Sequence, residues 1–330
     1  MWDLIFNRTK KNLPNYFSYS QLNSYEMCSE QYKLMYIDGL RSKYESLESY
    51  MGKRVHSVLE WLYKPENKEE YINFDKICEE YDREWVSNRH SKIFIVNTKF
   101  DRKKKKYVSS ILSDQELKKK EDMFYRIGKD CLSSYYQDNF PFDQAVSGRE
   151  FEITFSVKEY DKNNEPKFDK NTGNCIKEGK AIKEYPFKGV IDRIDKPYDK
   201  KWEIHDYKTG KRAKTSKQAQ SDFQLALYQI GVQQNFKNAD KIILIWHSLR
   251  HHTTISISHT AKQLYSIEKK IVKVIKKIQS ASTNLKNFKP KKDHQKSILC
   301  YWCPVWNECS AKTGPNPSFQ NSIKLLDSNK

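Results

Sequence analysis

In the middle of the chain, apolar side chains recur at every second position in three successive segments, and this pattern restricts the chain to folds that contain a β-sheet. The expected strands are Glu150–Val157, Tyr185–Asp195 and Lys201–Lys208, and the short polar stretch between the last two predicts a turn. A helical pattern follows from Asp222 to about Phe236, and an apolar strand from Lys241 to Leu249. Because strands are followed by a helix and another strand, we predict an α/β core.

Helical segments are expected to flank this core. The patterns predict helices at about 20–39, with Ser20 as its N-cap, 51–63, 70–88 and 114–137, and a Lys-rich amphipathic helix at 261–279. A further strand is expected at 253–258, and the polar stretch 158–183 is expected to form a long hairpin insertion.

We therefore divide the chain into four regions. They are a helical N-terminal region (1–145) that carries Cys28 and His56, a core (146–260), a C-terminal helix with a cysteine cluster (261–312) and a tail (313–330). The tail is polar, so we expect it to be flexible.

The charge balance points to an anionic partner. Sixty Lys and Arg side chains against 42 Asp and Glu give a net charge of +18. Aromatic residues make up 13% of the chain, which argues against disorder because they supply the bulk of a folded core. The basic run Lys99–Lys106 is interpreted as a solvated loop, with a contact to phosphate as an alternative of similar weight.

Several functional classes are excluded by what the sequence lacks. G-x-G-x-x-G and G-x-x-x-x-G-K-[ST] are both absent, which removes dinucleotide and P-loop sites and with them a helicase or ATPase engine. No apolar run approaches the roughly 18 residues of a membrane helix, and the first residues lack the pattern of a secretory signal. We therefore expect an intracellular, cytoplasmic protein with no membrane partner.

Three of the seven cysteines form a cluster. Cys300, Cys303 and Cys309 follow a C-x₂-C-x₅-C pattern, and disulfides are rare inside cells, so we expect free thiols or metal ligands. Three thiolates in one loop are soft ligands, and a tetrahedral site needs a fourth. Cys₄ sites bind zinc or an iron–sulfur cluster, and three unrelated buried thiols are the less favoured alternative.

A carboxylate and an ammonium end the third expected strand. Alternation puts Asp206 and Lys208 on its apolar face, and Val190, Asp192 and Ile194 are expected to share a face of the preceding strand. If the two strands pair as a hairpin, Asp192 and Asp206 converge, and they repel unless a cation lies between them. Oxygen ligands suit Mg²⁺ or Mn²⁺, which polarise phosphates and generate hydroxide, and Lys208 would stabilise developing charge or help to deprotonate water. The alternative is a surface salt bridge on a solvent-facing strand.

These residues belong to longer segments that occur in a particular order. The segments are Gly189-Val190-Ile191-Asp192-Arg193-Ile194-Asp195, then Asp206-Tyr207-Lys208-Thr209-Gly210, then Gln224-x-x-x-Tyr228, preceded by Gly52-x-x-x-His56 and by Glu152-Ile153-Thr154-Phe155. The ordered set resembles the PD-(D/E)XK nuclease superfamily, and within it the RecB/AddB-type nucleases. The likeness spans roughly residues 18–310, although 64–145 and 158–183 match nothing specific.

This resemblance implies a set of site residues. The implied metal ligands are His56, Asp192, Asp206 and the backbone carbonyl of Tyr207, and the implied catalytic lysine is Lys208. Gln224 and Tyr228 lie four residues apart on one helical face, so both reach the same site. Glu152 is implied as the acid of the adjacent strand, with a merely exposed strand position as the equal alternative. Without the resemblance, His56 would be read as a helix-surface histidine, and Gln224 and Tyr228 as packing residues.

The resemblance also implies a [4Fe–4S] cluster held by Cys28, Cys300, Cys303 and Cys309, with zinc as the alternative. Such a site would join the first helix to the last segment, and closing so long a loop could stabilise the fold strongly. Ser29 follows Cys28 where the family often has proline, which is a departure from its pattern.

The implied fold is a restriction-endonuclease-like core, with a mixed central sheet flanked by helices. The implied function is a Mg²⁺- or Mn²⁺-dependent deoxyribonuclease, most simply an exonuclease on single-stranded DNA or DNA ends, in DNA repair, recombination or processing. Two alternatives stay open: a non-catalytic DNA-binding protein with an iron–sulfur or zinc site, and a nuclease subunit of a helicase–nuclease or a CRISPR spacer-acquisition complex.

Overall fold

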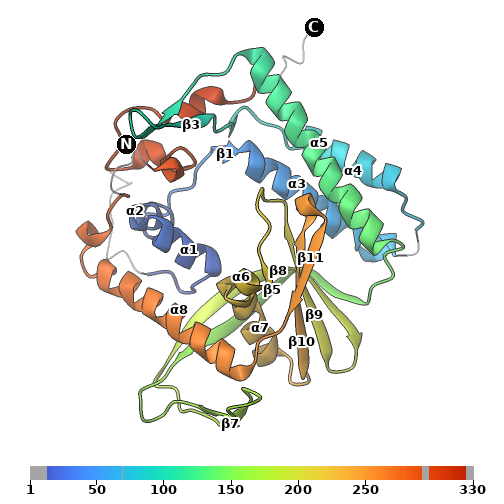
Figure 1. Cartoon of the computed structure of the whole chain (residues 1–330), viewed down its shortest axis with the longest axis vertical. Coiled ribbons are helices and arrows are strands. Elements are labelled where there is room, and N and C mark those ends of the chain that lie inside the picture. The colour runs from blue at the N-terminus through green and yellow to red at the C-terminus, as the bar shows by residue number, and fades with distance from the viewer. Residues whose placement is uncertain (1–12, 69, 292–296, 325–330) are drawn as a thin grey trace, which may run out of the picture.

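A five-stranded mixed sheet forms the centre of the computed structural model, which describes residues 13–68, 70–291 and 297–324 (Figure 1). The strand order is β11–β10–β9–β8–β5, and only β9 and β10 run parallel. The strands are β5 (Val146–Glu159), β8 (Lys183–Tyr198), β9 (Lys201–Lys208), β10 (Lys241–Ser248) and β11 (Thr253–Ile257). The predicted α/β core with a mixed sheet is confirmed.

The parallel neighbours β9 and β10 are joined by two helices, because a parallel pair needs a crossover. These are α6 (Ser216–Gln220) and α7 (Phe223–Asn235). Asp222 caps α7, since its Oδ1 accepts the backbone N–H groups of Gln224 at 2.9 Å and Leu225 at 3.1 Å. The middle of α7 is buried on all sides.

The first of two hydrophobic cores lies between the sheet and three helices, α1 (Tyr19–Met27), α7 and α8 (Ala261–Ser282). The apolar face of α8 was predicted from its spacing and is confirmed, and it buries Leu264, Ile267, Ile271, Val274, Ile275 and Ile278. The sheet contributes Ile153, Ile191, Ile194, Trp202, Ile204, Ile242, Leu244 and Trp246.

The second core lies on the other side of β9. Tyr207 belongs to it, whereas Ile204, three residues earlier on the same strand, belongs to the first core. Three mutually packed helices complete it: α3 (Leu47–Leu62), α4 (Phe74–Ser87) and α5 (Asp114–Asn139). Helices therefore flank the sheet, as predicted, and they do so on both sides.

The helix expected at 20–39 is interrupted. α1 ends at Met27, Cys28 is extended with φ −160° and ψ 110°, and α2 (Ser29–Tyr32) continues into a π-helical turn (Lys33–Ile37). The N-cap is Ser18 rather than Ser20, because the Ser18 hydroxyl accepts the backbone N–H of Gln21 at 3.3 Å.

The break at Cys28 brings the N-terminal helices against the C-terminal segment. Ser29 Oγ donates to the Lys289 carbonyl at 3.0 Å, and the backbone N–H of Glu30 donates to the same oxygen at 3.2 Å. Two segments 260 residues apart in the chain are thus joined beside Cys28.

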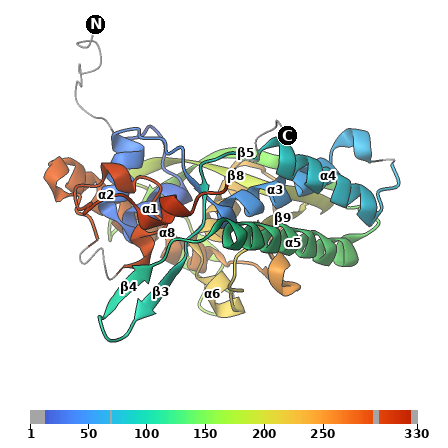
Figure 2. The same cartoon turned by 90° about the horizontal axis from the view of Figure 1, so that it is seen from above.

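The expectation of a loop at Lys99–Lys106 is wrong. Strands β3 (Thr98–Asp101) and β4 (Lys106–Ser109) pair in antiparallel register and form a hairpin that projects from the body (Figure 2). The insertion at 158–183 contains the hairpin β6 (Lys167–Phe168) and β7 (Cys175–Lys177). The short strands β1 (Glu45–Ser46) and β2 (Ile93–Phe94) pair in parallel.

Part of the expected flexible tail is packed. Ile323 is 2% exposed and its backbone N–H donates to the Ile93 carbonyl at 2.8 Å, while Asn321 Oδ1 accepts the backbone N–H of Leu112 at 2.8 Å. Residues 325–330 lie outside the described residues. Short 3₁₀ turns occupy Pro65–Asn67, Leu249–His251, Leu285–Asn287, Ile298–Cys300, Trp306–Glu308 and Pro317–Asn321.

None of the helices in the described ranges is long and apolar enough to cross a bilayer.

Candidate active site

Strands β8 and β9 separate at the site. The last paired residues of the two strands are Arg193 and His205. Beyond this pair, the Asp192 side chain lies between the strands, and its Oδ2 accepts the backbone N–H of Tyr207 at 2.7 Å. The prediction that Val190, Asp192 and Ile194 share one face of the strand is wrong. Ile191 and Ile194 both lie in the first core, so the alternation of side chains along β8 is interrupted between them. The interruption turns the Asp192 carboxylate toward the end of β9.

The neighbouring strand β5 is irregular at the same level. Glu150 has a φ of +39° and lies between Arg149, which pairs with Arg193, and Phe151, which pairs with Ile191. This left-handed conformation is uncommon for a residue other than glycine. It brings the Glu150 carboxylate close to Asp192. Burial raises the pKa of Glu150, and the negative charge of Asp192 raises it further.

Glu150, His56 and Asp192 form one compact group. One ligand atom from each residue lies within 4.8 Å of the other two. Neither carboxylate has a Lys or Arg partner among the ion pairs of the described chain. Two facing carboxylates that lack an ion pair with Lys or Arg are a fitting site for a divalent metal ion.

Asp206 and Lys208 end β9 as predicted, side by side. Lys208 Nζ lies 2.6 Å from Asp206 Oδ2, the Asp206 residue is 0% exposed, and its Oδ1 has no hydrogen-bond partner. Burial raises the pKa of Asp206 to about 6 in spite of Lys208, and the nearby Asp192 adds to the rise. The surface salt bridge considered from the sequence is therefore wrong, because the Asp206 carboxylate is fully buried.

Lys208 is held as a cation. Burial lowers the pKa of its ammonium, but Asp206 and Asp192 outweigh burial, so the pKa is raised overall. The ammonium also lies 5.0 Å from the centre of the Trp246 ring, and the side chain stays 33% exposed. It is thus fixed beside the carboxylates and still accessible.

His56 is placed by the close approach of α3 to the end of β9. A Cβ at Gly52 would lie 3.0 Å from Thr209 Oγ1, so glycine permits this approach. One helical turn later, His56 Nε2 lies 3.0 Å from the Tyr207 carbonyl oxygen, and its Nδ1 lies 3.6 Å from Asp192 Oδ1. Ligands about 2.1 Å from one Mg²⁺ at right angles would be about 3 Å apart. The separation of His56 Nε2 and the Tyr207 oxygen therefore fits two ligands of one ion.

Gln224 and Tyr228 form a linked pair on α7. Gln224 Nε2 donates to Tyr228 Oη at 2.9 Å, and Tyr228 Oη donates to the Val190 carbonyl at 2.5 Å. The two side chains therefore reach the backbone of β8 two residues before Asp192.

Glu152 does not join the group of His56 and Asp192. Its side chain is 65% exposed and forms an ion pair with Lys188 at 2.7 Å. Glu150, two residues earlier, lies in the site instead. From the sequence, Glu150 and Glu152 fitted the same strand equally well. The one available signal for an irregular strand near Glu150 was Gly148, since glycine within a strand often marks a bulge.

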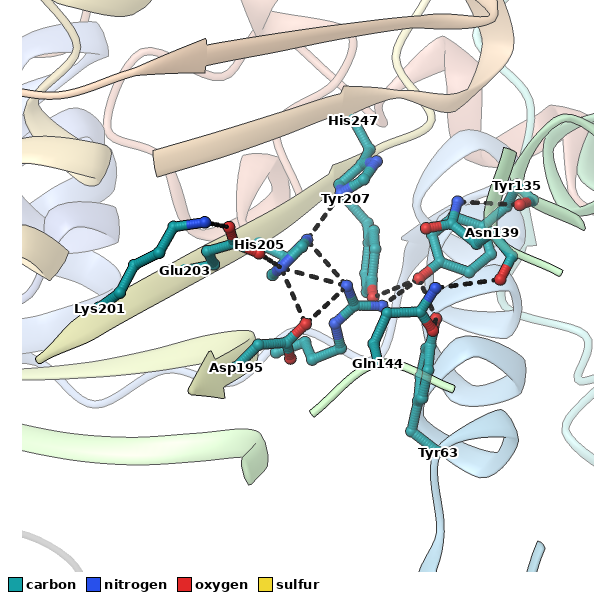
Figure 3. Close-up of polar contacts among 11 residues, drawn as sticks. Tyr63, Tyr135, Asn139, Gln144, Asp195, Lys201, Glu203, His205, Tyr207 and His247 are labelled. Carbon is teal, nitrogen blue, oxygen red and sulfur yellow. Dashed lines mark hydrogen bonds and ion pairs between the residues drawn. The ribbon is translucent and has the colours of Figure 1, made fainter. Parts of the chain in front are cut away.

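A buried polar network, which the sequence did not indicate, lies on the other side of β9 (Figure 3). Arg193 is 1% exposed, and its Nη2 lies 3.0 Å from Asp195 Oδ2 and 3.0 Å from His205 Nδ1. His205 Nδ1 lies 2.9 Å from His247 Nε2. Burial lowers the pKa of both histidines, which favours their neutral form. The charges that remain in the network are those of Arg193 and Asp195, and they balance each other.

Three tyrosines complete this network. Arg193 Nη1 donates to Tyr135 Oη, which lies 2.6 Å from Tyr63 Oη and 3.3 Å from Tyr207 Oη. Tyr63 comes from the C-terminal end of α3 and Tyr135 from α5. The network therefore joins these helices to Tyr207, whose backbone contacts His56 and Asp192.

A second group of ligand-type side chains within this network is already neutralised. Asp195, Glu203 and His205 place ligand atoms within 4.8 Å of one another. However, Arg193 pairs with Asp195, and Lys201 pairs with Glu203 at 2.7 Å. This group does not call for a metal ion.

The four cysteines implied as ligands line one cavity. Cys28, Cys300, Cys303 and Cys309 surround it together with apolar side chains, among them Leu34, Leu299 and Trp306. Burial raises the pKa of Cys300 to about 11, and the neighbouring Cys28 and Cys309 contribute to this rise. Cys78, Cys131 and Cys175 do not line this cavity.

The spacing of these sulfurs bears on the choice of cofactor. Within the described chain, no three of them place sulfur atoms within 4.8 Å of one another. Tetrahedral zinc with bonds of about 2.3 Å would need sulfurs about 3.8 Å apart. A cluster binds each thiolate through a different iron, so it tolerates wider spacing.

Comparison with known proteins gives one family, and the similar solved structures include the two that follow. The family model of the PD-(D/E)XK nuclease superfamily matches residues 16–310. A candidate exonuclease from Eubacterium rectale is 13% identical, with a TM-score of 0.46, over 91% of this chain and 90% of that chain. The protein SSO0001 is 14% identical, with a TM-score of 0.28, over 89% of this chain and 96% of that chain. No curated protein matches the chain.

Proposed function

Because the chain belongs to the PD-(D/E)XK nuclease superfamily, we propose that it is a metal-dependent deoxyribonuclease of the RecB/AddB type. The proposed reaction is hydrolysis of phosphodiester bonds with Mg²⁺ or Mn²⁺, as an exonuclease on single-stranded DNA or DNA ends. Family membership supports a nuclease, and the net charge of +18 supports a polyanionic substrate. The choice of DNA, the exonuclease action and the metal are the proposed part.

The observation that carries the proposal is that a buried acid, Asp206, pairs with the lysine cation beside a group of ligand-type side chains that has no Lys or Arg ion pair of its own. Asp206 is fully buried against Lys208, and one Asp206 oxygen lacks a partner. His56, Glu150 and Asp192 converge next to it. A structural salt bridge would not need three further ligand-type side chains at the same point.

Each residue has a distinct proposed role. His56, Glu150, Asp192, Asp206 and the Tyr207 carbonyl would hold the divalent ion, which supplies polarisation of the phosphate and a lowered pKa of bound water. Lys208, whose pKa is raised, would place its positive charge on the phosphate oxygens as they gain negative charge. This favours charge stabilisation over a role of Lys208 as the base.

Gln224 and Tyr228 are proposed as positioning residues. The Tyr228 hydroxyl is committed to the Val190 carbonyl, and Gln224 is committed to Tyr228. Both would fix the backbone of β8 and thereby the position of Asp192. Glu152 has no proposed role, because its side chain is exposed and paired with Lys188.

The cysteine cavity is proposed to hold a [4Fe–4S] cluster, with zinc as the alternative. Burial, together with the neighbouring thiols, raises the pKa of Cys300 and of Cys303, and binding of a metal group would hold them as thiolates. Tetrahedral zinc would need three or more sulfurs in a compact group, which the described residues do not show, and this favours the cluster over zinc. Its proposed role is structural, since it would join Cys28 to the C-terminal segment.

The test is cleavage of end-labelled DNA by protein purified without oxygen. Single-stranded and double-stranded DNA, and RNA of the same sequence, are incubated with Mn²⁺, with Mg²⁺ or with EDTA. Shortening of single-stranded DNA from its ends, abolished by EDTA and in Asp206→Ala and Lys208→Ala, is the expected result. Wild-type protein that binds DNA without cleaving it would favour the non-catalytic alternative.

A further inference from the structure

We propose that the hairpin of β3 and β4 (Thr98–Ser109) is an arm that binds the backbone of single-stranded nucleic acid. The choice of partner rests on the proposed nuclease function. The arm itself lies outside the group of metal-ligand side chains, in a part of the chain for which the family resemblance gives no expectation. Four features of the hairpin carry the inference.

The first feature is uncompensated charge. The tip, Arg102–Lys106, consists of five consecutive basic residues, all of them exposed. None of the five takes part in an ion pair within the described ranges. Five adjacent cations repel one another, and phosphates of a nucleic-acid strand would relieve this repulsion.

The second feature is that the single acidic side chain of the hairpin is used for its turn. Asp101 Oδ1 accepts the backbone N–H groups of Lys103 at 2.9 Å and Lys104 at 3.0 Å. These hydrogen bonds lower the pKa of Asp101. Asp101 therefore shapes the tip and leaves the lysine side chains pointing to solvent.

The third feature is the attachment of the arm to the body. Tyr301 Oη donates to the Tyr107 carbonyl at 3.0 Å, and the two rings lie 6.4 Å apart. At the base of the arm, Ser109 Oγ donates to the Asn97 carbonyl at 3.2 Å. The hairpin projects from the body beside the C-terminal segment, shown in red (Figure 2). A solubilising loop would need neither the strand pairing nor this anchor.

The fourth feature is an exposed ring beside the cations. Phe100 pairs with Tyr107 across the hairpin, and their rings meet edge to face at 5.2 Å. Phe100 is nevertheless 51% exposed, which is unusual for so apolar a side chain. An exposed aromatic face next to a row of cations is how proteins bind single strands, whose bases are free to stack.

The lysines of α8 provide an internal contrast. Lys269 pairs with Glu165 at 2.9 Å, and Lys276 pairs with Glu159. Three others, Lys270, Lys273 and Lys277, are exposed and lie outside the ion pairs of the described chain. They make a matched control for the arm, because they carry the same charge on a helix without an exposed ring beside them.

The experiment compares two triple variants. The arm variant is Lys103→Gln with Lys104→Gln and Lys105→Gln, and the control variant is Lys270→Gln with Lys273→Gln and Lys277→Gln, so both lose three positive charges. Binding of labelled oligothymidylate is measured in EDTA over a range of salt concentrations. The arm variant should bind about ten-fold more weakly than wild type. The plot of log binding constant against log salt concentration should also become less steep by about 2, because each of the three lost phosphate contacts contributes about 0.7 to its slope. The control variant should stay close to wild type.

Phe100→Leu tests the ring separately, because leucine keeps the apolar bulk and removes the stacking face. We expect about ten-fold weaker binding of single-stranded DNA, the typical loss for one stacked base, and unchanged binding of duplex DNA. Equal binding by the arm variant and the control variant would overturn the arm. Failure of the wild-type protein to cleave would overturn the nuclease proposal instead, and the binding comparison would still decide the role of the arm.

Discussion

The carboxylate of Asp192 accepts the backbone N–H of Tyr207 at 2.7 Å, at the point where β8 and β9 stop pairing. The same Tyr207 residue presents its carbonyl to His56 at 3.0 Å. One residue of β9 thus connects the implied metal ligands of a strand and of a helix. Its side chain points the other way, into the network of Arg193.

The two glutamates of β5 provide the first prediction. Glu150→Gln should weaken metal binding, so that the Mn²⁺ concentration for half-maximal cleavage rises about ten-fold or more. Glu152→Gln is the matched control, because Glu152 lies two residues away and is paired with Lys188 in solvent. The measurement is the cleavage rate as a function of Mn²⁺ concentration. Similar metal dependence in both variants would remove Glu150 from the site.

The approach of α3 to β9 provides the second prediction. Gly52→Ala places a Cβ 3.0 Å from Thr209 Oγ1, so the helix or the turn must shift by a few tenths of an ångström. We expect a several-fold lower cleavage rate from the displaced His56, with no loss of thermal stability, since alanine stabilises a helix by about 1 kcal/mol relative to glycine. Thr209→Ala should restore part of the activity in the double variant. An unstable but fully active Gly52→Ala protein would contradict this account.

Local patterns predicted the framework of the fold. The bounds of β9 and the presence of α7 followed from period-two alternation and from a capped helical pattern, which depend only on neighbouring residues. Asp206 and Lys208 were placed side by side for the same reason. Such features do not need knowledge of distant contacts.

Other features depend on contacts that a local pattern does not contain. Arg193 would be read from the sequence as one more surface charge, yet Tyr135, 58 residues away, and Asp195 make it a buried residue. The choice of Glu150 over Glu152 depends on an irregularity in how β5 pairs with β8. The break at Cys28 likewise depends on the C-terminal segment that packs beside it.

The network of Arg193 provides the third prediction. Tyr135→Phe removes the hydroxyl that accepts from Arg193 and contacts Tyr63 and Tyr207. Leaving a buried donor without its partner should lower the free energy of unfolding by about 1–3 kcal/mol. Tyr136→Phe is the control, because the hydroxyl of Tyr136 has no hydrogen bond to the described chain. Equal unfolding midpoints in urea for the two variants would show that the network contributes no stability.

Glu48, in the first turn of α3, provides the fourth prediction. Burial raises the pKa of its carboxyl to about 7, and its Oε2 has no hydrogen-bond partner. The stability contributed by the neutral form is fully present below the ordinary pKa near 4.5 and is lost as the pH rises through about 7. Glu48→Gln should therefore raise the free energy of unfolding at pH 8 by about 1–3 kcal/mol and have little effect near pH 4. Glu66→Gln, at an exposed position, should have no such pH dependence, and a destabilised Glu48→Gln protein at pH 8 would refute the assignment.

The cysteine cavity provides the last prediction. If Cys28, Cys300, Cys303 and Cys309 hold a [4Fe–4S] cluster, protein purified without oxygen should be brown and contain about four irons per chain. Cys28→Ala should remove the colour as fully as Cys303→Ala, although the two residues lie at opposite ends of the chain, because both line the same cavity. Cys78→Ala is the control and should keep the colour, since Cys78 lies in α4 and does not line the cavity.

Loss of the cluster should also lower the unfolding temperature, because the link between the N-terminal helices and the C-terminal segment is lost with it. Colourless protein with one zinc ion would refute the cluster and keep the four ligands, whereas a Cys28→Ala protein with its full metal content would remove Cys28 from the site.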